Sequence, residues 1–231
     1  MQAIVAIGGG ELGLGETRAI DEYIVSLPDA LTPRVLFIPT ASGDHPGYIE
    51  CFSKVYGELG CLVDILRLYG AAADAPEAIA AKFAAADIIY VGGGDTDMML
   101  AKWRKTGIDS HLRAAYERGV VLSGLSAGAL CWASCGMTDR SDDDDFIPGW
   151  LEGLSLLPFG IGVHYDEPFW QQLDELAARQ DAPVIALENC TALSVIDGHM
   201  TVIRSREDRH AWLLRPANGD IVKTRYEGGC L

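Results

Sequence analysis

The sequence is short of basic residues and lacks any apolar run long enough to cross a bilayer. Lysines and arginines number 18 against 33 aspartates and glutamates, which gives a formal net charge of −15. Such an excess of negative charge disfavours nucleic acid and anionic membranes as partners, and a membrane-spanning helix needs roughly 20 consecutive apolar residues. The chain opens Met-Gln-Ala-Ile-Val, which is typical of a strand and not of a signal peptide. We therefore expect a cytoplasmic protein that binds neither membrane nor nucleic acid.

Metal-binding and disulfide patterns are missing too. Six cysteines are scattered along the chain and form no CxxC pair, so we expect reduced, mostly buried thiols and neither a metal nor an organic cofactor. Neither a linker nor an internal repeat divides the 231 residues, which predicts one domain over residues 1–231. A homo-oligomer is compatible with these features.

The sequence does contain an alternation of strand-length apolar runs with segments of helical period. This alternation is typical of successive βαβ units, so we predict a three-layer α/β/α fold with a mainly parallel sheet. Expected strands are residues 3–7, 35–38, 62–66, 88–91, 120–122, 161–163 and 184–187, and expected helices are residues 16–26, 46–59, 75–85, 96–105, 110–118, 129–133 and 167–180. A hairpin around Asp197 and Gly198 and a strand at 211–214 predict antiparallel strands added at the C-terminus.

A GxSxG pentapeptide occupies residues 124–128, directly after a predicted strand and before a predicted helix. In this setting the motif predicts a nucleophile elbow, in which Ser126 stands on a tight turn and the helix N-terminus directs free N–H groups toward its oxygen. The alternative is a turn of small residues without chemistry.

A glycine-rich turn follows the preceding strand at residues 92–94. Ligands of open parallel sheets lie outside the carboxyl ends of the strands, so the backbone amides of Gly93 or Gly94 could form an oxyanion hole together with that of Ala127. The same residues also fit a helix start that is capped by Asp95 or Thr96. Both interpretations can hold together.

A serine nucleophile needs a base and an acid. His164 directly follows the predicted strand 161–163 and is the best-placed histidine, and Glu188 closes the strand 184–187 and is the preferred acid. The acidic run at 139 and 142–145 is expected to be a solvated loop, but one of its carboxylates could take the place of Glu188. We assign Asp95, Asp166 and Glu167 as candidate substrate-binding residues.

The order serine, histidine, glutamate differs from that of ordinary α/β-hydrolases. Together the motifs resemble the peptidase E and cyanophycinase group of serine peptidases, whose fold is similar to that of class I glutamine amidotransferases and is flavodoxin-like. The resemblance rests on six segments spread between roughly residues 3 and 196: residues 7–11, 37–41, 90–96, 124–129, 162–165 and 186–193.

The resemblance implies acyl transfer to Ser126 with His164 as general base and then general acid. Glu188 matches the acid position of cyanophycinase-like members. A small peptide is the implied substrate, most simply a dipeptide. Members that cleave dipeptides with N-terminal aspartate are expected to have an arginine after the histidine, but here no basic residue occurs between His164 and Arg179. Strict aspartyl specificity is therefore not expected, and Asp166 and Glu167 could bind an α-amino group or a basic side chain.

Two other function classes remain. Residues 8–13 satisfy the GxGxxG pattern of nicotinamide-binding domains, but the second strand ends Ile-Pro-Thr-Ala and lacks the acid that would bind the ribose. A binding protein that keeps the amidotransferase-like fold without turnover is the other alternative.

Overall fold

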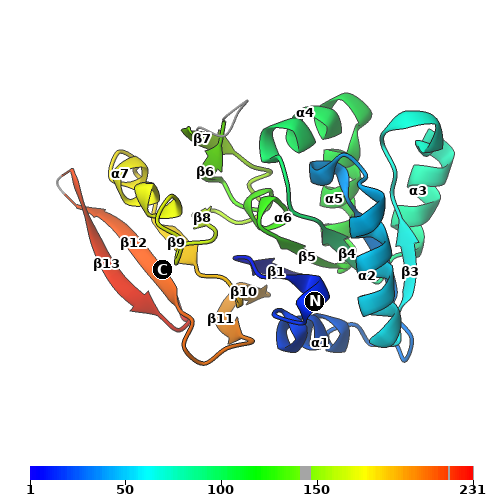
Figure 1. Ribbon diagram of the computed structural model, residues 1–231, viewed down its shortest axis with the longest axis horizontal. Helices are drawn as coiled ribbons and strands as arrows, with labels where there is room; N and C mark the ends of the chain where they lie inside the picture. Colours follow the sequence, from blue (N-terminus) through cyan, green and yellow to red (C-terminus); the bar gives the residue numbers. More distant parts are fainter. Residues whose placement is uncertain (141–146, 218, 231) are drawn as a thin grey trace.

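The structure is a computed structural model and describes residues 1–140, 147–217 and 219–230 (Figure 1). The helices are α1 (Arg18–Ser26), α2 (Pro46–Glu58), α3 (Pro76–Ala85), α4 (Thr96–Thr106), α5 (Ile108–Glu117), α6 (Ala127–Leu130) and α7 (Leu173–Ala177). The strands are β1 (Ala3–Ile7), β2 (Arg34–Ile38), β3 (Leu62–Ile65), β4 (Ile88–Val91), β5 (Val121–Leu125), β6 (Cys135–Asp139), β7 (Pro148–Glu152), β8 (Gly160–Gly162), β9 (Val184–Leu187), β10 (Thr191–Ile196), β11 (His199–Arg204), β12 (Ala211–Ala217) and β13 (Asp220–Tyr226).

The larger sheet runs β11-β10-β1-β5-β4-β2-β3 in the described part of the chain. The five neighbouring strands β1, β5, β4, β2 and β3 are parallel to one another. Strands β10 and β11 join the sheet antiparallel, next to β1. Parallel strands need helical crossovers, and α1 to α5 supply them. The predicted α/β class, the mainly parallel sheet and the antiparallel C-terminal strands are therefore confirmed.

Alternating side chains of the larger sheet contact different helices. Ile4 and Leu122 face a core that includes buried residues of α3, α4 and α5, and Val5 and Val121 face one that includes residues of α1 and α2. Both faces of a parallel sheet must be covered in this way, which explains why its strands are apolar throughout. The helices thus form two layers around the sheet.

The predicted strands 161–163 and 184–187 form β8 and β9, and they belong to a second sheet of order β13-β12-β9-β8-β6-β7. Strands β6, β7 and β13 of this sheet were not predicted. Of the predicted helix 167–180, only α7 and the 3-10 turn Trp170–Gln172 are present, because only Leu173 and Ala177 in this stretch are buried.

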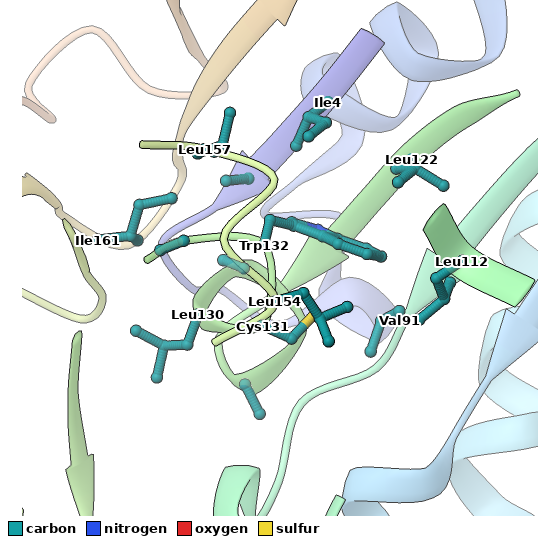
Figure 2. Packing of buried hydrophobic residues seen from close by; sticks show 14 of the residues in the cluster. Ile4, Val91, Leu112, Leu122, Leu130, Cys131, Trp132, Leu154, Leu157 and Ile161 are labelled. Atoms are coloured by element: carbon teal, nitrogen blue, oxygen red, sulfur yellow. The ribbon is translucent and has the colours of Figure 1, made fainter. Parts of the chain in front are cut away.

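One apolar core joins the two sheets. Figure 2 shows Trp132 between Ile4 and Leu122 of the larger sheet and Ile161 of the smaller one, all of them fully buried. Removal of this large ring from water stabilises the folded protein by several kcal/mol, at about 25 cal/mol per Å² of buried apolar surface. We keep a single domain as our interpretation of this shared packing.

Candidate active site

Ser126 stands on the predicted strand-to-helix turn. β5 ends at Leu125 and α6 begins at Ala127, and Ser126 between them has φ 56° and ψ −112°, a conformation that is strained for a residue with a side chain. A Cβ on Gly124 would lie 2.4 Å from Gly128 O, and one on Gly128 would lie 2.1 Å from Val91 O. Both glycines of the motif are therefore required for the backbones to approach, as the sequence indicates.

His164 lies beside Ser126 although the two come from different sheets. Its Nε2 is 2.9 Å from Ser126 Oγ. The contact is possible because the backbone continues from β1 into the gap between the sheets, where Gly8 O accepts a hydrogen bond from His164 N at 3.0 Å. The histidine side chain is 20 % exposed, so Nε2 is shielded but reachable from the cavity.

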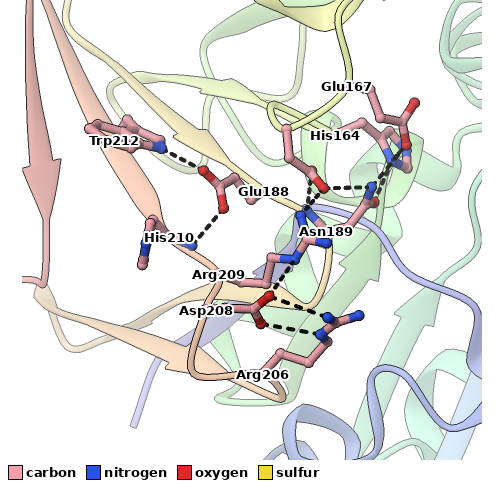
Figure 3. A network of polar contacts seen from close by, with 10 residues as sticks. His164, Glu167, Glu188, Asn189, Arg206, Asp208, Arg209, His210 and Trp212 are labelled. Carbon is pink, nitrogen blue, oxygen red and sulfur yellow. Dashed lines mark hydrogen bonds and ion pairs between the residues drawn. The ribbon is translucent and has the colours of Figure 1, made fainter.

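Asn189, and not Glu188, contacts the other nitrogen of this imidazole. Asn189 Oδ1 lies 2.7 Å from His164 Nδ1, whereas the Glu188 carboxylate accepts hydrogen bonds from His210 N at 2.9 Å and Trp212 Nε1 at 2.8 Å (Figure 3). The expected pairing of Glu188 with His164 is thus corrected to Asn189.

Strand alternation explains this correction. Ile185 and Leu187 of β9 face the shared core, while Val184 and Ala186 face the cluster under α7. Because neighbouring side chains of a strand point to opposite faces, the next residue, Glu188, continues the α7 side and Asn189 the other. This alternation is the signal in the sequence from which Asn189 could have been identified.

Two carboxylates fix the orientation of the Asn189 amide. Its Nδ2 donates to Glu167 Oε1 at 2.8 Å and to Asp166 Oδ2 at 3.4 Å, and its backbone N donates to Asp166 Oδ1 at 2.8 Å. Ionised carboxylates only accept, so Nδ2 must face them and Oδ1 must face the histidine. Oδ1 can only accept a hydrogen bond, so the proton of a neutral imidazole resides on Nδ1. Nε2 is then free to accept the Ser126 hydroxyl proton.

Asp166 is itself held by Arg209, whose Nη1 forms an ion pair with Asp166 Oδ2. The two side chains are only 26 % and 17 % exposed. The arginine thus compensates a half-buried carboxylate that supports Asn189. Arg209 lies far from the other site residues in the sequence and was not predicted.

The glycine run that follows β1 makes room for the histidine and asparagine. A Cβ on Gly9 would lie 2.0 Å from Asn189 Oδ1 and 2.4 Å from His164 Nδ1. A Cβ on Gly8 would lie 2.5 Å from Glu188 O. Close packing thus accounts for Gly8 of the GxGxxG pattern and for its neighbour Gly9 without a dinucleotide.

A cavity of about 620 Å³ opens in front of Ser126 and His164. Gly93 and Gly94 line it, as predicted, and Ala127 begins α6, so its N–H has no carbonyl within the helix to donate to. Asp95 caps α4 by accepting from Met98 N at 2.8 Å and is absent from the described residues that line the cavity. It therefore has the structural role that the sequence offered as the alternative to substrate binding.

The cavity wall carries charges of both signs. Glu11, Glu16, Asp166 and Glu167 line it together with Arg206 and Arg209 from the loop between β11 and β12. The two arginines supply the basic groups that are absent from the stretch after His164.

The acidic run that was considered as an alternative source of the acid falls mostly outside the described residues, since residues 142–145 belong to the undescribed segment 141–146. Asp139 is described, and its Oδ1 accepts a hydrogen bond from Ile147 N at 3.0 Å. Among the residues described, no group of three or more histidine, cysteine or carboxylate side chains could hold a metal ion. No helix in the same part of the chain is long and apolar enough to span a membrane.

A parallel α/β fold with a serine at a strand-to-helix turn and a histidine hydrogen-bonded to it defines a hydrolase-like class of protein. The comparison with family models is more specific. Residues 4–203 match peptidase family S51, and the chain belongs to this family.

Relatives agree with this assignment. The chain is 36 % identical over 228 residues to an uncharacterized peptidase of Bacillus subtilis, YgaJ, covering 96 % of both chains, and 26 % identical over 201 residues to peptidase E of Streptomyces coelicolor, covering 83 % of this chain and 78 % of the relative. The crystal structure of a peptidase from an acI-B1 actinobacterium superposes with a TM-score of 0.72 at 20 % identity, over 100 % of this chain and 96 % of the other. The resemblance to peptidase E, stated from the motifs, is confirmed, and the family supports a peptidase function.

Proposed function

We propose that the protein is a serine peptidase that hydrolyses small peptides through an acyl-enzyme on Ser126. The observation that carries the proposal is the hydrogen-bonded line from Ser126 Oγ through both ring nitrogens of His164 to Asn189, with distances of 2.9 and 2.7 Å. A hydroxyl beside an oriented imidazole is the arrangement needed for an activated nucleophile.

In the proposed reaction, Ser126 Oγ attacks the peptide carbonyl carbon while His164 Nε2 takes the hydroxyl proton. Asn189 keeps the imidazole in the required tautomer and orientation, a role that a carboxylate has in the Ser-His-Asp arrangement and an asparagine in Cys-His-Asn proteases. The Ala127 N–H, with those of Gly93 or Gly94, stabilises the oxyanion. Collapse of the intermediate breaks the C–N bond and the amine leaves with the proton from His164. Water then attacks the ester by the reverse sequence of proton transfers.

For the substrate we propose small peptides, most simply dipeptides. Both oxygens of Asp166 are bound by Asn189 and Arg209, which leaves Glu167 as the better group for an α-amino end. The Glu167 side chain is 51 % exposed, and the described residues offer no partner for its Oε2. Arg206 lines the same cavity and could receive a carboxylate of the peptide.

A fluorophosphonate probe tests the nucleophile, because it phosphonylates only activated serines. We expect labelling of the wild type, none of Ser126→Ala, and a loss of several orders of magnitude in kcat for His164→Ala. Full labelling of Ser126→Ala would exclude this serine. A dipeptide library with varied first residues would then identify the preferred substrate.

The alternative of a binding protein without turnover predicts that neither labelling nor hydrolysis occurs although peptides bind. The alternative of an oxidoreductase predicts that a nicotinamide cofactor raises the melting temperature. The oriented imidazole favours the peptidase over both, because neither alternative needs an unprotonated nitrogen next to a serine.

A further inference from the structure

Tyr48 lies on the cavity wall without a role in the chemistry described so far. It sits in the first turn of α2, and its ring packs edge-on against Phe37 at a centroid distance of 5.1 Å and an angle of 70°. This packing restricts the ring, so the hydroxyl at its tip has a defined position. Tyr48 lines the same cavity as Ser126 and Gly93.

The glycines at 92 and 93 separate Tyr48 from Ser126 by the width of a backbone. A Cβ on Gly92 would lie 2.9 Å from Tyr48 Cε1, and one on Gly93 would lie 3.4 Å from Ser126 Cβ. Tyrosine and serine therefore pack against neighbouring glycines of one strip of backbone, and both side chains line the same cavity.

The amide of Gly93 is directed at this tyrosine. Gly93 N donates to Tyr48 Oη at 3.3 Å, a long hydrogen bond. The N–H that the sequence assigns to an oxyanion hole is thus partly used by the hydroxyl. The hydroxyl, in turn, accepts this bond with a lone pair and keeps its own proton for donation.

No acceptor for the Tyr48 proton occurs among the described residues. Burial raises the pKa of Tyr48 to about 12, so the phenol stays protonated at any pH at which the histidine works as a base. A protonated hydroxyl that accepts a bond from an amide is polarised and becomes a stronger donor.

Resting on the proposed function, we infer that Tyr48 Oη donates a hydrogen bond to the oxyanion of the tetrahedral intermediate and is a catalytic residue of the oxyanion hole. The Gly93 N–H acts through the tyrosine, and the Ala127 N–H binds the oxyanion directly from the other side. The tyrosine keeps its proton throughout, so it stabilises charge without taking part in proton transfer.

Tyr48→Phe tests the inference because it removes the hydroxyl and keeps the ring. We expect kcat to fall by about 100-fold, as for loss of one oxyanion donor in other serine peptidases, with KM changed by less than about twofold. Labelling of Ser126 by a fluorophosphonate should slow by a similar factor, because the phosphonyl oxygen occupies the same hole.

Tyr90→Phe is the matched control. Its ring belongs to the same aromatic cluster, 6.2 Å from Phe37 and 4.9 Å from Phe52, and its buried hydroxyl has no hydrogen-bond partner in the described part of the chain. We expect wild-type kcat and labelling for this variant. Thermal unfolding of both variants shows whether they are folded.

A folded Tyr48→Phe protein with kcat within about twofold of the wild type would overturn the inference while leaving Ser126 as the nucleophile. A rise in KM at unchanged kcat would also overturn it, since the hydroxyl would then contact only the ground state. Labelling or turnover by Ser126→Ala would instead remove the proposed function itself.

Discussion

The side-chain amide of Asn189 and the imidazole of His164 meet at 2.7 Å, and the orientation of the amide is set from behind by Asp166 and Glu167. A neutral amide therefore gains its orientation from two carboxylates, and one of them, Glu167, also lies 3.5 Å from His164 Nδ1 through its Oε1. The shortest contact of His164 Nδ1 is thus with an amide oxygen, and the carboxylate of Glu167 lies farther from it.

Substitutions at 188 and 189 separate the two residues that follow β9. Asn189→Ala removes the acceptor for His164 Nδ1, and we expect kcat to fall by about 10² to 10⁴ because the imidazole loses its tautomer and orientation. Glu188→Gln keeps an acceptor for Trp212 Nε1 and should cost less than about tenfold. Steady-state kinetics on the same peptide measure both, and a larger loss for Glu188→Gln would return the supporting role to Glu188.

Gly9→Ala tests the close approach of the β1 exit to the site. The new methyl group would overlap Asn189 Oδ1 and His164 Nδ1, so we expect a loss of at least about 100-fold in kcat through displacement of the catalytic groups. Gly57→Ala is the control. Gly57 lies in α2, and a Cβ at this position would meet no other atom within 4 Å. The substitution should leave activity unchanged and raise stability by about 0.5–1 kcal/mol. Wild-type activity of Gly9→Ala would show that His164 and Asn189 can be displaced without loss of activity.

Arg209→Met leaves Asp166 as an uncompensated half-buried carboxylate. We expect Asp166 to turn toward solvent and release Asn189, with a decrease in kcat of about tenfold or more. Arg206→Met on the same loop removes an exposed arginine whose ion pair is with Asp208 at 3.2 Å, and it should change KM and leave kcat alone. The opposite pattern would assign the positioning role to Arg206.

The pH dependence of stability has a predicted contribution from Asp21. This side chain is fully buried between Thr17 Oγ1 and Tyr56 Oη, and burial raises its pKa from 3.8 to about 6. Because the folded-state pKa is the higher one, the unfolded chain releases its proton first, and stability falls as the pH rises from about 4 to about 6. A shift of about two units corresponds to about 3 kcal/mol.

Asp21→Asn removes this titration. We expect the difference in unfolding free energy between variant and wild type to increase in favour of the variant by up to about 3 kcal/mol between pH 4 and pH 7, measured by urea unfolding. A pH-independent difference would show that Asp21 titrates normally in the folded protein.

Much of the site was predictable because its signals are local. Five consecutive residues, 124–128, predict the strand-to-helix turn at Ser126, and His164 directly follows an apolar strand. The choice between Glu188 and Asn189 depends on which face of β9 meets the neighbouring sheet, and that is a property of tertiary packing. Strand-length apolar runs also do not specify their partners, so the division into two sheets was not predictable from them.

The unpredicted strands have a physical explanation of the same kind. β6 and β7 contain Gly136, Pro148 and Gly149 and carry charged residues at their ends, which are poor signals for strands. They pair through Gly136 and Leu151, and the hairpin is then fixed by the parallel contact of β6 with β8. The β-propensity of these two segments is weak, and they become strands because of the strands with which they pair.

The serine belongs to one sheet and its histidine and asparagine to the other, so the distance between Oγ and Nε2 records how the two sheets are docked. If the smaller sheet detached locally from the larger one, His164 and Asn189 would move away from Ser126. Activity would then be lost while the larger sheet and its helices remained folded. Activity is therefore a more sensitive gauge of the native assembly than any measure of helix content.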